Sequence, residues 1–308
     1  MVAETGLQPD RRLLPKVGLR HWGRYVSAVI VLAVLLALGY AVSQGAIEWH
    51  LVPDQLTQSV MLEGVRNTIE LAVVAQAGAV VIGVVVALMR LSRNPLLRLV
   101  AFGYTWLFRG LPVLLQIILW YNIALIFPRI VVPVPFTSLH LINESSNTLV
   151  TAFLAALLGL GLNESAYMAE IVRAGLSSVD PGQREAAESI GMTPGKILRR
   201  VVLPQAMRVI VPPTGNDFIN MIKGTSLASV IGFVEITKAA QNLSSHSLAV
   251  VEDLLAGAVW YMVIVSVANV GQYFLERHYS ASLRDPGRGL TFRIGRSLRT
   301  PPLMRGAE

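Results

Sequence analysis

Charged and amide side chains inside long apolar segments are the residues whose types and spacing could do chemistry here. Asn216, Asn220 and Lys223 recur at positions i, i+4 and i+7, so they share one face of a helix. Glu164 lies in another apolar segment. A central lysine in a membrane helix costs about 2.5–3.5 kcal/mol on insertion scales, so it must face a partner, a bundle interior or water. These residues form either a functional polar site or a polar contact that locks helices together.

The composition indicates that lipid is the solvent of these segments. The chain has 308 residues, of which 53% are hydrophobic and 15% charged, whereas about a quarter of the residues in soluble domains are charged. It has no cysteine, which excludes disulfides, a thiolate nucleophile and a Cys-ligated metal. Its five histidines form no HExxH pair. We therefore expect that this chain itself binds no metal and no cofactor.

Several apolar windows are long enough to cross about 30 Å of hydrocarbon. They lie near residues 25–43, 60–89, 110–127, 148–169, 209–234 and 254–275. We expect an all-α membrane protein with six transmembrane helices.

Lysine and arginine residues are distributed unevenly between the connecting segments. The segments 44–59, 128–147 and 235–253 together hold only Arg129 and Lys238, and the other connecting segments and both ends are basic. The positive-inside rule places the basic segments, and with them both termini, in the cytoplasm. The net charge of +7 therefore reflects membrane topology rather than a nucleic-acid partner.

The first window is either a retained anchor or the apolar part of a cleaved signal peptide. Its basic flank and the small residues that follow fit both, and its length favours an anchor. Cleavage would leave five spans and an external N-terminus. We expect residues 1–24 to form a basic cytoplasmic N-terminus, 25–59 to form the anchor and an external loop, and 276–308 to form a basic cytoplasmic tail.

Two other windows differ from plain apolar helices. The second carries small residues four apart, which allow close helix packing: Ala75, Ala79, Gly83 and Ala87. In the third, Gly110 and Pro112 weaken the helix. Arg109 beside them marks either the membrane boundary or a pathway.

The stretch "EAAESIGMTPGKILRRVVLP", residues 185–204, lies between windows on the cytoplasmic side. Asp180 and Pro181 are typical of a helix start, and Gly191 suits a left-handed helix end. The helix between them would present Ala186, Ala187 and Ile190 on one side. Such a short helix with a small-residue face is suited to a groove in another protein.

The segment "GMTPGKI" within this stretch is not a phosphate-binding loop. Three residues separate its glycines instead of four, and Ile197 stands where Ser or Thr should hold magnesium. Any ATPase that works with this chain must therefore be a separate partner.

This cytoplasmic stretch resembles the EAA motif of the permease subunits of bacterial ABC importers. The motif reads EAA, three residues, Gly, nine residues, Ile, one residue and Leu-Pro. At that spacing the chain has Glu185, Ala186, Ala187, Gly191, Val201, Leu203 and Pro204, with Val in place of Ile. In that family the motif is a coupling helix that docks on the ATPase. The resemblance implies that Glu185, Ala186, Ala187, Gly191, Leu203 and Pro204 are ATPase-coupling residues in a loop at 178–204.

The stretches "FRGLPVLLQ", "ESAYMAEIVRAGL" and "NMIKGTSLASVIG" are similar to permeases of the polar amino acid uptake branch. Leu111 departs from the Thr that is usual there. The resemblance covers residues 60–275, a five-span permease core that here has one extra N-terminal span. It implies a non-enzymatic subunit in a prokaryotic cytoplasmic membrane. It also implies a homodimer or heterodimer of permeases, ATPase subunits that use ATP and Mg, and an extracellular or periplasmic amino-acid-binding protein.

An amino acid is a zwitterion, so a membrane site must replace water around both of its charges. We expect Glu164 to face an ammonium or a cationic side chain, and Asn220 and Lys223 to face the carboxylate, with Thr225 and Ser226 as donors. An ion-coupled secondary transporter, with Glu164 and Lys223 as relays, is the alternative. A membrane hydrolase would need a paired nucleophile and base, and the Ser and His residues show no such spacing.

Overall fold

The computed structural model describes residues 22–45, 47–133 and 140–280, and the chain divides into two units, Met1–Glu48 and Trp49–Glu308. In the first unit, α1 (Trp22–Ser43) has no buried residue. The predicted basic termini, 1–24 and 276–308, fall largely outside the described residues.

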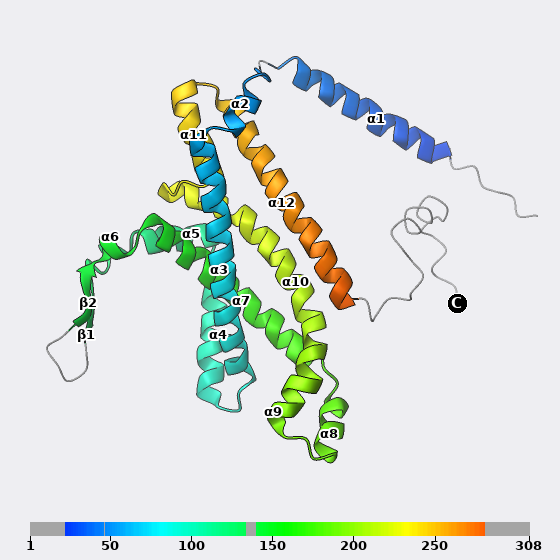
Figure 1. Cartoon of the computed structure of the whole chain (residues 1–308), viewed down its shortest axis with the longest axis vertical. Helices are drawn as coiled ribbons and strands as arrows, with labels where there is room; N and C mark the ends of the chain where they lie inside the picture. Colours follow the sequence, from blue (N-terminus) through cyan, green and yellow to red (C-terminus); the bar gives the residue numbers. More distant parts are fainter. Residues whose placement is uncertain (1–21, 46, 134–139, 281–308) are drawn as a thin grey trace, which may run out of the picture. The chain divides into compact units, whose positions relative to one another are not determined.

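The second unit is built mainly of helices (Figure 1). In chain order they are α2 (Val52–Leu56), α3 (Ser59–Leu91), α4 (Pro95–Gly110), α5 (Val113–Tyr121), the 3-10 helix η2 (Ile123–Leu125), α6 (Ser146–Leu149), α7 (Ala152–Ser177), α8 (Pro181–Ser189), α9 (Pro194–Ile197), the π-helix η3 (Leu198–Val202), α10 (Leu203–Gly224), the 3-10 helix η4 (Thr225–Ile231), α11 (Ile236–Ser247) and α12 (Val250–Ser280).

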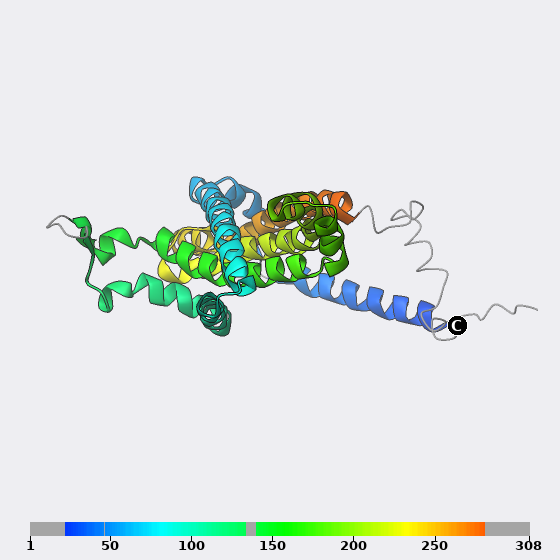
Figure 2. The ribbon, with the colours of Figure 1, turned by 90° about the horizontal axis from the view of Figure 1, so that it is seen from below.

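A β-hairpin interrupts the helices, so the all-α expectation was incomplete. Strand β1 (Arg129–Pro133) pairs antiparallel with β2 (His140–Ser145), with Arg129 opposite Ser145. The consecutive β-branched residues Ile130, Val131 and Val132 favour an extended strand. Figures 1 and 2 both show the hairpin projecting away from the helices of its unit.

The described helices provide between four and six candidate membrane spans. Helices α1, α3, α7 and α12 are each long and apolar enough to cross. Two bent pairs could each add one span: α4 with α5, at 99°, and the continuous segment Pro194–Ile231 with Ile236–Ser245, at 43°. The third predicted window, 110–127, thus begins where α4 ends. The predicted window covers α5 and η2, which follow the bend, but it does not include α4.

The core of the second unit forms where α3 crosses α7, and small residues make that crossing possible. Ala75, Ala79 and Ala87 are fully buried on α3. A Cβ at Gly83 would lie 2.5 Å from Met168 Cβ and 3.0 Å from the Ser165 carbonyl oxygen of α7. The packing face predicted from the four-residue spacing is therefore confirmed.

The break between α4 and α5 is held by amide side chains. Gln116 Nε2 donates to the carbonyl oxygens of Phe108 (2.9 Å) and Leu111 (3.0 Å). Asn163 Nδ2 of α7 donates to the same Phe108 oxygen at 2.6 Å. Backbone groups freed by a break inside a membrane must find partners within the protein, and these side chains provide them.

The break between η4 and α11 is held in the same way by side chains of α3 and α12. The buried Glu235 caps α11 by accepting the N–H groups of Thr237 and Lys238, both at 2.8 Å, and Tyr261 donates to it at 2.6 Å. Asn67 Nδ2 donates to the Val234 oxygen at 2.8 Å, and the N–H of Ile236 donates to Thr68 Oγ1 at 3.2 Å.

The crossing of α3 and α7 predicts unequal effects of the same substitution at two glycines of α3. Gly83→Ala should destabilise the protein by about 1–3 kcal/mol, because its Cβ overpacks against backbone and Met168. Gly78→Ala is the matched control, since nothing lies within 4 Å of a Cβ there. Thermal unfolding of the two detergent-purified variants provides the comparison. Equal midpoints would show that the crossing does not depend on Gly83.

Candidate functional site

The short helix α8 has the predicted start and end. Asp180 Oδ1 accepts the N–H of Gly182 at 2.7 Å, and Pro181 is the first helical residue. At the other end Gly191 has a φ of +76°. Its N–H donates to the Glu188 oxygen (2.9 Å), and that of Met192 donates to the Ala187 oxygen (3.1 Å). These bonds form a Schellman motif, which ends α8 abruptly.

One alanine attaches α8 to the rest of the chain. Ala187, 5% exposed, packs with the buried Ile197 and Val202. Glu185, Ala186 and Gly191 are exposed. Ile190, the C-cap of α8, is 78% exposed, whereas Ala187 is buried.

The Leu-Pro end of the motif coincides with a change of helix type. Pro204 has no N–H, so the Arg200 carbonyl lacks its usual partner, and residues Leu198–Val202 form a π-helix just before it. Gln205 Nε2 donates to the Val201 oxygen at 3.0 Å. Leu203 and Pro204 are themselves exposed, at the first turn of α10.

The polar residues of α10 lie on one exposed face of that helix, as predicted. Asn216, Asn220 and Lys223 are all exposed. Ser226 is half-buried and its Oγ donates to the Lys223 oxygen at 2.8 Å. Thr225 is fully buried and donates to the Ile222 oxygen at 2.7 Å, so it does not share this face.

Glu164 is paired with a residue that the sequence reasoning missed. Its carboxyl group lies close enough to that of Asp217 on α10 for the two to interact electrostatically, and its Oε1 is buried without a hydrogen-bond partner. No ion pair joins Lys223 to Glu164 within the described part of the chain. The rule that singled out Glu164, an ionisable residue within a span, also applies to Asp217. Two neighbouring carboxylates repel each other, and a shared proton or a bound cation would relieve that repulsion.

Arg109 lies close to the same part of α7. Its guanidinium carbon is 5.0 Å from the centre of the Tyr167 ring, and Tyr167 follows Glu164 by one helical turn. Groups of both charge signs therefore lie on α4, α7 and α10. Among the residues that the structure describes, no cluster of His, Cys, Asp or Glu could hold a metal ion. This arrangement is suited to binding a small charged solute.

The structure thus combines helices long and apolar enough to span a membrane with the short capped helix α8, as a multi-pass membrane protein would. The family model described as "Binding-protein-dependent transport system inner membrane component" matches residues 79–281. The chain belongs to this family, and its relatives are permeases of amino acid ABC transporters.

Known proteins of this kind are similar over most of the chain. The arginine transport system permease protein ArgU of Corynebacterium glutamicum is 40% identical, over 85% of this chain and 81% of that protein. The probable amino-acid permease protein YxeN of Bacillus subtilis is 35% identical, over 73% and 93% respectively. A solved amino acid ABC transporter with histidines is 35% identical, with a TM-score of 0.60 over 71% of this chain and 94% of that one.

The Schellman motif predicts that two glycines of the loop 178–204 differ in their tolerance of a side chain. Gly191→Val places a branched residue at positive φ, which costs about 1–3 kcal/mol, and should shift the end of α8. Gly195→Val is the matched control, because a Cβ at either glycine meets nothing within 4 Å and Gly195 has no positive φ.

We expect Gly191→Val to lower recovery of the ATPase subunit in a pull-down while both variants insert normally in the membrane. Normal recovery together with normal uptake in Gly191→Val would rule out a coupling role for this helix end.

Proposed function

We propose that this chain is the translocating subunit of an ATP-driven importer that moves a polar amino acid across the prokaryotic cytoplasmic membrane. It would work as a homodimer or heterodimer with two copies of a separate ATPase and with an extracellular or periplasmic amino-acid-binding protein. The observation that carries the proposal is the capped helix α8, which exposes Glu185 and Ala186 and is attached to the chain through Ala187. ATP and Mg would be used by the ATPase subunits alone.

The contacts of α8 support a mechanical link to the polar face. Ala187 packs on Ile197 of α9 and Val202 of η3, and the segment Pro194–Ile231 runs on as one helix. Movement of α8 by a docked ATPase would therefore reach Asn220 and Lys223 on α10. This is coupling between two sites through an element with two positions.

The polar face supports passage of a zwitterion. The Glu164–Asp217 pair could face an ammonium or guanidinium group, while Lys223 and Asn220 face a carboxylate, with Ser226 beside them. Lys223 is exposed on a single protomer, and a lysine that faces hydrocarbon has a large free-energy cost. A second permease subunit or water must therefore cover this face.

The orientation of the core is part of the same proposal. Helix α8 lies in the predicted cytoplasmic loop at 178–204, and the core of residues 60–275 would have both termini on that side. The surplus of Lys and Arg in these segments supports this orientation.

The carboxyl pair also suits an ion-coupled secondary transporter, because Glu164 and Asp217 could relay a proton. Uptake into proteoliposomes that contain the permease, its ATPase and its binding protein distinguishes the two functions. The importer is supported if import requires ATP on the side of the membrane where the ATPase lies. Import should also persist after ion gradients are collapsed. Import driven by an ion gradient without ATP would show that the chain is a secondary transporter instead.

Removal of single charges tests the polar face. Glu164→Gln and Lys223→Met each keep the size of the side chain, and each should raise the KM of uptake by about 10- to 100-fold, the value of one hydrogen bond to a charged group. Glu70→Gln is the matched control, because Glu70 is an exposed carboxylate that pairs with Arg66 on its own helix at 4.0 Å. Basal ATP hydrolysis should stay unchanged in all three variants.

Transport with unchanged affinity in both variants would exclude these residues from the site. Failure of the complex to assemble would instead identify them as a structural lock between helices.

A further inference from the structure

The segment between α5 and α7 lies at the end of α7 opposite the cytoplasmic loop. It comprises η2, β1, β2 and α6 and joins α7 at its N-terminal residue Ala152, whereas α8 follows its C-terminal residue Ser177. A helix of 26 residues separates these ends by about 39 Å. With α8 in the cytoplasm, the hairpin lies on the outer side of the membrane.

The described residues of β1 and β2 are exposed or half-buried, so they form no core of their own. Leu141 is 74% exposed and Leu125, at the base of the hairpin, is 83% exposed. The other outer elements are packed: Met61, Ile236 and Ala256 form a fully buried cluster, and Trp260 Nε1 donates to the Leu56 oxygen at 3.0 Å. A lone two-stranded hairpin is marginally stable in water, so this one requires a surface to pack against.

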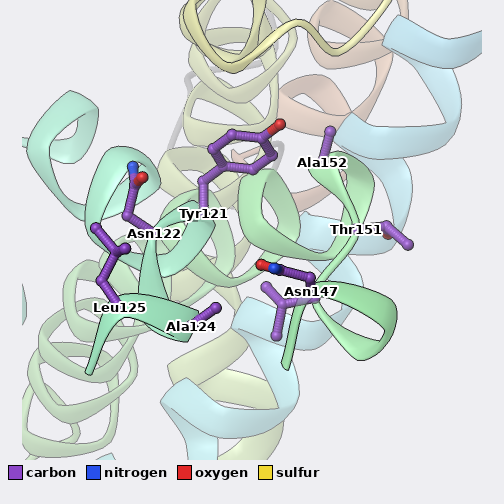
Figure 3. Close-up of a pocket in the computed structure, with 8 residues that line it drawn as sticks. Tyr121, Asn122, Ala124, Leu125, Asn147, Thr151 and Ala152 are labelled. Atoms are coloured by element: carbon purple, nitrogen blue, oxygen red, sulfur yellow. The ribbon is translucent and has the colours of Figure 1, made fainter. Parts of the chain in front are cut away.

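Four of the eight residues that line a cavity at the base of the hairpin have polar side chains. The cavity has a volume of about 410 Å³ and is partly open to the outside. Tyr121, Asn122 and Leu125 come from the end of α5 and η2, and Asn147 and Thr151 come from α6 and the start of α7 (Figure 3). Amide and hydroxyl groups gain nothing from hydrocarbon, because each loses its hydrogen bonds to water there. The cavity therefore suits a protein surface rather than lipid tails.

We propose that the outer hairpin surface, defined by Leu125, Leu141 and the cavity residues Asn122, Asn147 and Thr151, is the docking site of the extracellular solute-binding protein. This inference rests on the proposed function. The family to which the chain belongs is described by its dependence on a binding protein, and such a protein must contact the outer side. Exposed apolar side chains beside a polar, water-accessible cavity match the centre and rim of a transient protein interface.

A charge on the hairpin should weaken docking without touching the transport machinery. Leu141→Asp should raise by at least tenfold the concentration of binding protein that half-stimulates ATP hydrolysis, with basal hydrolysis unchanged. The probe is the binding protein that stimulates the wild-type complex in proteoliposomes. Leu248→Asp is the matched control, because Leu248 is 85% exposed and follows the packed helix α11 on the same outer side.

An equal effect of both variants, or no effect of Leu141→Asp, would overturn the assignment. If Leu141→Asp does not fold, the Leu141→Cys variant is used instead, because the wild-type chain has no cysteine. Labelled with a photoreactive maleimide, it should give an adduct with the binding protein. An adduct with a second permease or with lipid only would contradict docking at this surface. Absence of ATP-driven uptake by the wild type would instead refute the proposed function.

Discussion

The need to satisfy every backbone N–H and C=O group inside lipid governs this structure, because the chain repeatedly breaks or distorts its helices. Water is not available in the bilayer core, so freed groups need protein partners. Amide and carboxylate side chains close to each irregularity provide them: Gln116 and Asn163 between α4 and α5, Gln205 beside the π-helix, Gln272 at Pro212, and Asn67 and Glu235 before α11. Several come from a different helix than the break, so they also fix helices to one another.

This constraint explains why polar residues in the spans are of two kinds. Asn163 and Gln272 direct their amide N–H groups to backbone carbonyls, at 2.6 and 2.8 Å, and are structural. Asn220 and Lys223 are exposed on α10, and Glu164 keeps one oxygen buried without a partner. Residues of the second kind satisfy no backbone break. The free-energy cost of placing these polar groups within the membrane must therefore be offset by a solute, water or a second subunit.

The sequence predicts features that depend on local rules and fails where the outcome depends on distant partners. The Asp180 start, the Gly191 end and the small-residue face of α3 follow from propensity and spacing within one helix. The π-helix before Pro204 and the 99° bend at Pro112 depend on which side chains reach the freed carbonyls. The sequence did not predict the hairpin, because its short β-branched run follows a long apolar window and has the same apolar character as that window. The sequence did not predict a role for Asp217, because the helical spacing rule selected Asn216 and Asn220, which lie on a different face of the helix.

The attachment of α8 to the rest of the chain is small. Few side chains hold it: Ala187 against Ile197 and Val202, with partly buried residues around them. Burial of one alanine contributes little, since a buried CH₂ is worth about 0.8 kcal/mol. A helix held so weakly by its own chain can be moved at low cost, and its contacts lie on a segment that continues to Ile231. Because α10 spans 22 residues, about 33 Å, a small tilt at the end next to α8 would displace the polar face near its other end.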